Sequence, residues 1–134
     1  INIIKNIEET TVFNFENELL QVIINILNNA KDELIKKEKG DTRYIFLDLY
    51  KTNNNLIIEI KDNAGGINPE VIDRIFEPYF TTKHKSMGTG IGLYMCQEII
   101  VKHLKGSIEV SNEVYEYENK TLTGALFKII IPSE

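Results

Sequence analysis

Residues 44–62 read YIFLDLYKTNNNLIIEIKD, and the fold class follows from their pattern. Tyr44–Lys51 and Leu56–Asp62 are rich in β-branched and aromatic residues, which favour strands. Thr52–Asn55 joins the two segments as a turn, so the pattern predicts a β-hairpin. A Rossmann-type fold needs helical crossovers between parallel strands, and a hairpin does not fit that arrangement.

Upstream of this hairpin, the apolar period changes to that of a helix. The pattern runs over residues 17–39, and Gly40 ends it. The expected buried face of this helix consists of Leu20, Ile23, Ile24, Leu27, Ala30 and Leu34. Before the helix, residues 1–7 and 11–15 predict another hairpin with an acidic turn.

Downstream, Asn68-Pro69-Glu70 is typical of a helix start and predicts a short helix that ends near Phe76. Residues 77–90 show no period and predict a loop, and residues 91–104 predict a further helix that Gly106 ends. The expected buried face of that helix consists of Leu93, Cys96, Ile100 and Leu104. Two final strands are expected over 107–113 and 122–132, joined by an acidic turn that contains tyrosines.

The resulting order, ββ-α-ββ-α-loop-α-ββ, predicts the α+β class. We expect a two-layer α/β sandwich in which a mixed, mostly antiparallel sheet carries its helices on one face. The length of 134 residues suits a single domain over 1–134.

The composition excludes several classes of protein. The net charge of −5, from 15 basic and 20 acidic residues, argues against a nucleic-acid-binding protein. The apolar runs are short and interrupted by amides, so none is long enough to span a bilayer. The single cysteine, Cys96, excludes an internal disulfide and fits a reducing compartment. Because the chain begins at Ile1, we expect it to be a fragment of a longer protein.

The helix over 17–39 carries an unusual polar stripe. Its members lie at i, i+4, i+7, i+8 and i+11, which is one helical face: Gln21, Asn25, Asn28, Asn29 and Asp32. Amide oxygens are hard ligands that can hold Mg²⁺ while phosphate oxygens and water complete the octahedron. A merely polar face in an asparagine-rich chain accounts for the stripe equally well.

Two glycine-containing segments could bind a nucleotide. Asp62-Asn63-Ala64-Gly65-Gly66-Ile67 follows a strand, where an aspartate can accept a hydrogen bond from the exocyclic amine of adenine, although a plain turn explains this segment better in isolation. Gly88-Thr89-Gly90-Ile91-Gly92-Leu93 opens a helix, where free N–H groups bind anions, but alone it is weak evidence. Between them, residues 75–83 combine aromatics with Thr-Thr-Lys and could form a lid.

Taken in order, these segments resemble the motifs of the histidine kinase catalytic domain, in the superfamily shared with gyrase, Hsp90 and the MutL mismatch-repair proteins. Residues 25–30 resemble its N box, 62–67 its G1 box, 76–83 its F box and 88–93 its G2 box, and Gly124 occupies a G3-like position. The resemblance covers nearly the whole chain, and spaced motifs in the right order are more specific than any one of them. It implies the Bergerat-type ATP-binding fold, with ATP held between the helices and a lid.

The resemblance also implies roles for the matching residues. Asn29 and Asn25 would coordinate Mg²⁺ on the ATP phosphates, and Asn29 and Lys83 would be catalytic. Asp62 would bind the adenine amino group, and Gly66 would let the adenine approach. The implied nucleotide contacts are Asn25, Asn29, Asp62, Gly66, Ile67, Phe80, Lys83, Gly88, Thr89, Gly90, Ile91, Gly92 and Leu93.

The glycines Gly88, Gly90 and Gly92 would also act as lid hinges, and Phe76 and Phe80 would pack at the lid base. The chain departs from the family pattern at Ala64, where many members have glycine, at Asp32, where several have lysine, and at Ala125, which is often threonine.

The implied reaction transfers the γ-phosphoryl group of ATP to a histidine on a separate dimerisation domain, which would pass it to a response regulator. His84 and His103 are the only histidines, and we expect both to be surface residues rather than the acceptor. The isolated fragment is expected to be a cytoplasmic monomer without membrane contact, and the parent kinase a homodimer.

Three alternatives stay open at this point. The domain could be a nucleotide-binding regulatory module that has lost catalysis. It could be a serine kinase of the anti-sigma type or a gyrase-like or Hsp90-like ATPase, for which Glu33 offers a base one turn past Asn29. A pure protein-interaction domain would leave the amide stripe and the glycine segments unexplained.

Overall fold

The computed structural model describes residues 1–7, 16–36, 42–80 and 91–132. In chain order, the elements are β1 (Asn2–Ile7), α1 (Glu16–Leu34), β2 (Tyr44–Thr52), β3 (Asn55–Asp62), the 3₁₀ turn η2 (Ile72–Arg74), α2 (Gly92–Glu98), its π-helical continuation η3 (Ile99–His103), β4 (Ser107–Tyr117) and β5 (Lys120–Pro132).

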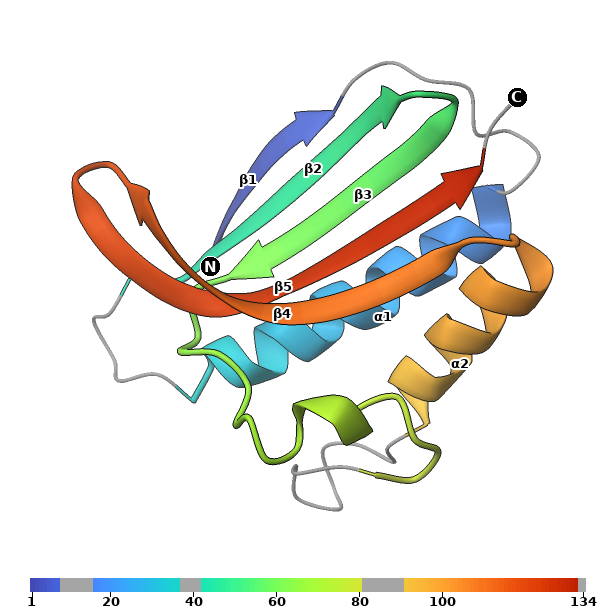
Figure 1. The fold of residues 1–134 in the computed structure, drawn as a ribbon. Coiled ribbons are helices and arrows are strands. Elements are labelled where there is room, and N and C mark those ends of the chain that lie inside the picture. The colour runs from blue at the N-terminus through green and yellow to red at the C-terminus, as the bar shows by residue number, and fades with distance from the viewer. Residues whose placement is uncertain (8–15, 37–41, 81–90, 133–134) are drawn as a thin grey trace.

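The strands form one five-stranded sheet in the order β1-β2-β3-β5-β4. Strands β1 and β2 run parallel, and every other neighbouring pair is antiparallel. Helices α1 and α2 pack on the same face of this sheet, which makes two layers (Figure 1). The predicted α+β sandwich with a mixed, mostly antiparallel sheet is therefore confirmed. Residues 11–15, the expected hairpin partner of β1, lie outside the described residues.

The β2–β3 hairpin is confirmed, with Thr52 paired to Asn55. Its turn residues Asn53 and Asn54 have φ of 48° and 65°, in the left-handed region that asparagine tolerates better than most residues. The turn therefore has the two-residue form whose twist matches the flanking strands.

The last two strands are longer than predicted. Residues 114–117, expected in an acidic turn, belong to β4, and the turn shrinks to Glu118 and Asn119. The tyrosines explain the difference, because the ring of Tyr117 packs edge-on against Tyr44 at 5.1 Å and against Phe46 at 4.9 Å between ring centroids. These contacts lie on the sheet face opposite the helices, which the curled β4–β5 hairpin partly covers (Figure 1).

The core lies between the sheet and the helices. Alternate residues of the central strands face α1: Leu56, Ile58 and Ile60 of β3, and Phe127, Ile129 and Ile131 of β5. Helix α1 contributes Leu19, Val22, Ile26, Ala30 and Leu34. The predicted helix face was therefore wrong in part, because Leu20 and Ile24 are 49% and 53% exposed. Helix α1 is apolar on more than one side, so spacing alone did not determine which stripe packs on the sheet.

The second helical segment buries Cys96, Ile100 and Leu104 as predicted, with Leu93 partly buried. It widens at its end, where the N–H of Leu104 donates to the carbonyl of Ile99 over 3.0 Å. Gly106 follows because a Cβ there would lie 2.2 Å from the carbonyl oxygen of Ile130 in β5.

The helix expected from residue 68 to about 76 was wrong. Asn68 does cap the segment, since its Oδ1 accepts the N–H of Glu70 over 2.9 Å, but only Ile72–Arg74 is helical, as one 3₁₀ turn. His103 is an exposed residue at the end of η3, as predicted, and its Nδ1 lies 3.1 Å from Oε2 of Glu18. His84 lies outside the described residues.

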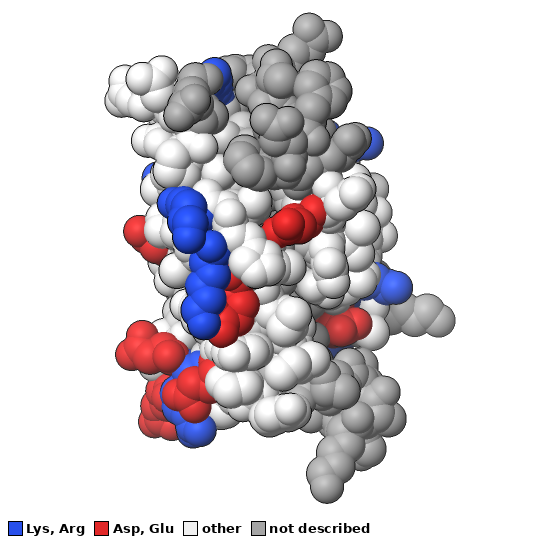
Figure 2. All heavy atoms as spheres, turned by 90° about the vertical axis from the view of Figure 1, so that its right-hand side faces the viewer, with Lys and Arg blue, Asp and Glu red and all other residues white. Residues whose placement is uncertain are grey.

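The described surface carries charges of both signs. On the face in Figure 2, Lys and Arg side chains lie next to Asp and Glu and form no broad basic area among the described residues. None of the described helices is both long and apolar enough to cross a membrane.

Candidate functional site

Asp62 is the last residue of β3, and its side chain is only 5% exposed. Its Oδ1 accepts the N–H of Ala64 over 3.0 Å and the N–H of Ala125, from β5, over 3.2 Å. A buried carboxylate must find such donors to offset its lost hydration. Asp62 is therefore held in one orientation at the end of the strand.

Position 124 requires a glycine, because its main chain lies directly against Asp62. A Cβ at this position would lie 1.7 Å from the main-chain oxygen of Asp62 and 2.7 Å from its Oδ1. From the sequence alone, Gly124 had no role beyond a G3-like position, and its packing against Asp62 supplies one. The preceding residue also takes part, since the carbonyl of Thr123 accepts the N–H of Gly65 over 2.9 Å.

The two glycines after Asp62 both have a positive φ. Gly65 and Gly66 have φ of 104° and 90°, where residues with a Cβ are strained. The turn leads into Ile67, whose main chain is bound by the side chain of Asn112 in β4. Between these points, Asn63 is buried and has a structural role, because its amide binds the N–H of Tyr44 and the carbonyl of Thr42.

Sequence reasoning missed two residues of this site, Asn112 and Tyr115. The hydroxyl of Tyr115 donates to the main-chain oxygen of Asp62 over 2.6 Å. Burial and the nearby Asp62 carboxylate raise the pKa of Tyr115, so its hydroxyl stays a donor. Along β4, Asn112 and Tyr115 follow the usual alternation of strand residues between the two sheet faces. No local sequence motif therefore identified them as residues of a site.

The amide stripe of α1 divides into two parts. Gln21 and Asn28 are exposed, whereas Asn25, Asn29 and Asp32 are half-buried. The half-buried members lie beside the buried stripe of the same helix rather than on its open side. Only part of the predicted face is thus placed where it can line a site.

Asn25 connects α1 to the beginning of α2. Its Oδ1 lies 4.0 Å from where a Cβ of Gly92 would be, so nothing separates the two helices there. Its side chain also hydrogen-bonds Cys96, whose thiol pKa burial raises to about 11 while this hydrogen bond opposes the rise. The start of α2, with Ile91, Gly92 and Leu93, is therefore fixed next to Asn25.

The described part of the expected lid packs on the body of the protein. Phe76 meets Phe127 edge-on at 6.3 Å between ring centroids. The ring of Phe80 lies 4.4 Å from the guanidinium of Arg74. Lys83, Gly88, Thr89 and Gly90 lie outside the described residues.

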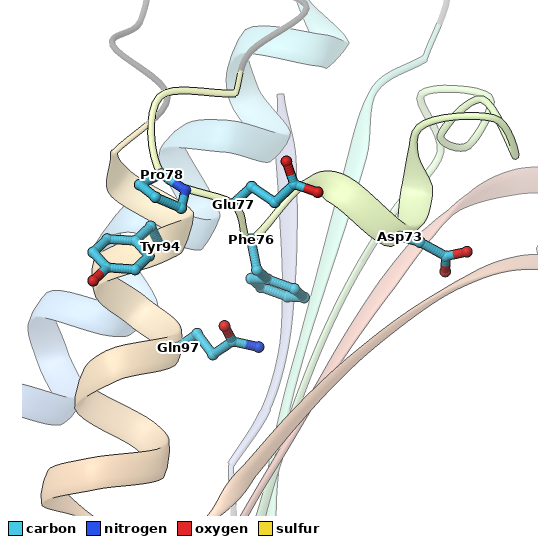
Figure 3. A pocket seen from close by; sticks show the side chains of 6 residues that line it. All are labelled: Asp73, Phe76, Glu77, Pro78, Tyr94 and Gln97. Carbon is cyan, nitrogen blue, oxygen red and sulfur yellow. The ribbon is translucent and has the colours of Figure 1, made fainter.

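An open hollow of about 320 Å³ lies between η2 and α2. Its walls are Asp73, Phe76, Glu77, Pro78, Tyr94 and Gln97 (Figure 3). None of the predicted nucleotide contacts that the structure describes lines this hollow. Among the described residues, no group of three His, Cys, Asp or Glu side chains could hold a metal ion.

Residues 14–134 match the family described as histidine kinase-, DNA gyrase B-, and HSP90-like ATPase. The chain is 37% identical to the two-component sensor PprA of Pseudomonas aeruginosa over 117 residues, which are 86% of this chain and 12% of PprA. It is 31% identical to sporulation kinase C of Bacillus subtilis over 131 residues, which are 96% of this chain and 27% of that kinase.

The fold has the same relationship to solved structures. The catalytic domain of histidine kinase ThkA superposes with a TM-score of 0.73 at 25% identity, covering 98% of this chain and 80% of that one. The chain spans only a small part of the two sensor kinases above. The resemblance seen in the boxes is confirmed, and the chain belongs to the histidine kinase-, DNA gyrase B- and HSP90-like ATPase family, as an ATPase domain of the histidine kinase type.

Proposed function

We propose that this domain binds Mg-ATP and donates the γ-phosphoryl group to a histidine on a separate phosphoacceptor domain in two-component signal transduction. The observation that carries the proposal is the Asp62 carboxylate, buried at the end of β3 and oriented by main-chain donors from two segments. Each carboxylate oxygen can accept more than one hydrogen bond. Asp62 can therefore bind the exocyclic amine of adenine and keep its main-chain partners.

Asn25 and Asn29 are the proposed ligands of Mg²⁺. They are half-buried, one turn apart on α1, and Asn25 lies against the start of α2. Their amide oxygens suit a hard cation that takes its other ligands from phosphates and water. When bound, Mg²⁺ would neutralise charge on the phosphates.

The remaining steps require positioning rather than covalent chemistry by the protein. We assign Lys83 to the terminal phosphates, Asn29 to the metal, and the segment from Gly88 to Leu93 to the phosphate oxygens. Gly66, Ile67 and Phe80 complete the proposed nucleotide contacts. Phosphoryl transfer then moves the γ-phosphorus from the ATP β–γ bridging oxygen to a histidine nitrogen of the acceptor, with ADP as the leaving group.

We place the domain in the cytoplasm, as one part of a longer, homodimeric kinase. The place within a longer kinase is supported by the relatives, since the chain spans 12% of PprA and 27% of sporulation kinase C. Its proposed partners are the phosphoacceptor domain of its own kinase and a response regulator.

Calorimetric titration of the chain with ATP and Mg²⁺ tests the proposal. We expect Asp62→Asn and Asn29→Ala each to weaken binding at least about tenfold, or roughly 1.4 kcal/mol. Asn28→Ala is the matched control, because Asn28 is exposed on the same helix and its loss should leave the affinity unchanged. No binding at millimolar ATP, or equal effects of the two asparagine variants, would contradict the proposed site.

A further inference from the structure

Asn112 of β4 binds the main chain of Ile67 at two points. Its Nδ2 donates to the carbonyl of Ile67 over 2.7 Å, and its Oδ1 accepts the N–H of Ile67 over 2.7 Å. Ile67 offers one donor and one acceptor, so only one orientation of the amide satisfies both. The side chain thus imitates a pair of strand–strand hydrogen bonds and attaches the segment after β3 to the sheet.

The same amide accounts for one of the two glycines. A Cβ on Gly66 would lie 2.9 Å from Oδ1 and 3.1 Å from Cγ of Asn112, whereas a Cβ on Gly65 would have nothing within 4 Å. Both positions have a positive φ. Gly65 is therefore required by its backbone conformation alone, but Gly66 also leaves room for the Asn112 amide. The approach of adenine, expected from the family resemblance, is not needed to explain Gly66.

The segment from Asp62 to Ile67 is held at successive points along its length. Asp62 is bound by Ala125, and Gly65 by Thr123, both from β5. Beyond Gly65, the two hydrogen bonds of Asn112 attach the turn to the sheet. Asn112 also pairs with Ala125 in the β4–β5 register, so both attachments lie at one level of the sheet.

We propose that Asn112 is a positioning residue of the nucleotide site. It holds the main chain of Gly66 and Ile67 in the position that contact with the adenine base requires. This proposal rests on the proposed function, because it assigns the fixed turn to nucleotide binding. Asn112 does not need to touch the nucleotide. Its effect passes through the main chain of Ile67.

Asn112→Ala, with Ser111→Ala as the control, tests the role in binding. Asn112 is exposed, so water can replace its amide and the variant should fold. Ser111 is also exposed and precedes Asn112 on β4, but its side chain lies on the other face of the sheet. We expect Asn112→Ala to speed hydrogen exchange of the Ile67 N–H and to weaken Mg-ADP about threefold to fivefold. Ser111→Ala should change neither.

Affinity is measured well below the melting temperature of each variant, because a purely global loss of stability leaves the affinity of the folded chain unchanged. An unchanged affinity in Asn112→Ala, with faster exchange at Ile67, would show that the amide is only structural and overturn the proposal. Unchanged exchange at Ile67 would overturn it at an earlier step.

A double-mutant cycle tests the coupling to Gly66 without any ligand. In the wild-type background, Gly66→Ala should lower the melting temperature more than Gly65→Ala, since only the former also meets Asn112. In the Asn112→Ala background, the two glycine substitutions should be equally harmful. If the excess effect of Gly66→Ala persists there, Asn112 does not set that position. The cycle remains informative if the wild-type chain fails to bind nucleotide, so failure of the proposed function is distinguishable from failure of this inference.

Discussion

At the scale of single residues, the site depends on a close approach of β5 to Asp62. A Cβ at Gly124 would lie 1.7 Å from a main-chain oxygen, which a side-chain rotation cannot relieve. Strand β5 would have to move away, and with it the Ala125 N–H that orients the carboxylate. We expect Gly124→Ala to destabilise the fold by about 3 kcal/mol, as in other overpacked sites. We also expect it to weaken ATP binding more than Asp62→Asn does.

Thermal unfolding and calorimetry of Gly124→Ala check this expectation. Thr123→Ala is the comparison, since Thr123 is exposed and contributes its main-chain carbonyl to Gly65, which alanine retains. A stable Gly124→Ala variant with normal ATP affinity would show that Asp62 does not need its donor from β5.

Local sequence patterns predicted only those site residues that act together with their neighbours in the sequence. The strand-end aspartate and paired glycines of 62–67 form such a pattern, and in the structure both glycines have a positive φ. Asn112 and Tyr115 act on that segment from 45 and 53 residues away. Their roles follow from the register of β4 on β5 and the curl of that hairpin, which no local pattern encodes.

At the scale of elements, the two-residue turns differ in how well their residues fit. Asn53 and Glu118 both open such a turn with φ of 48°. Asparagine is favoured in this conformation and glutamate is not. We expect Glu118→Asn to increase the free energy of unfolding by about 0.5–1 kcal/mol and so to raise the melting temperature. Asn53→Glu should lower the melting temperature. Opposite shifts in a calorimetric scan confirm the argument, and a fall with Glu118→Asn would refute it.

A pair of like charges lies across β2 and β3. Asp48 and Glu59 are directly opposite in the register, and burial, together with the Glu59 charge, raises the pKa of Asp48 above its ordinary 3.8. A raised pKa means that the folded state disfavours the carboxylate, so the stability associated with its protonation is present below pH 3.8 and lost as the pH rises through the folded value.

Asp48→Asn should therefore stabilise the fold at pH 7, by up to about 1 kcal/mol, and the gain should vanish below the ordinary pKa of the side chain. Urea unfolding at several pH values measures both effects. A gain that does not depend on pH would assign the benefit to packing rather than to charge.

The helices show where sequence patterns were insufficient at this scale. Leu20 and Ile24 fit the helical period as well as Leu19 and Val22 do, and only the packing on β3 and β5 selects the second set. The segment after Asn68 carries good start signals but few core contacts, and only Ile72–Arg74 becomes helical. Start signals and period describe an isolated helix, whereas burial decides which helix forms.

At the scale of the whole molecule, the two faces of the sheet have different tasks. The helix face contains the core and the proposed nucleotide site, and the opposite face carries the aromatic cluster of Tyr44, Phe46, Tyr115 and Tyr117. Tyr115 joins the two, because its ring packs on Phe46 while its hydroxyl binds the main chain of Asp62. The curled β4–β5 hairpin (Figure 1) thus supports Asp62 from the sheet face opposite the helices.

The proposed function gives a prediction for the molecule as a whole. Among the described residues, His103 lies at the surface with its Nδ1 3.1 Å from Oε2 of Glu18. Because the proposed acceptor histidine belongs to a separate domain, this chain should bind ATP and label itself poorly. Adding a separately produced phosphoacceptor domain from its own kinase should start transfer. The product should be acid-labile phosphohistidine on that domain, followed with γ-labelled ATP, and Asn29→Ala should abolish it while Asn28→Ala should not.

The rival ATPase reaction predicts a different result from the same mixture. A gyrase-like or Hsp90-like enzyme would release phosphate without an acceptor and would need a base such as Glu33. The Glu33 carboxylate lies 3.2 Å from Nζ of Lys36, which follows the end of α1, and this ion pair competes with a role in activating water. We therefore expect Glu33→Gln to leave phosphohistidine formation intact. Acceptor-independent phosphate release that Glu33→Gln removes would instead favour the ATPase.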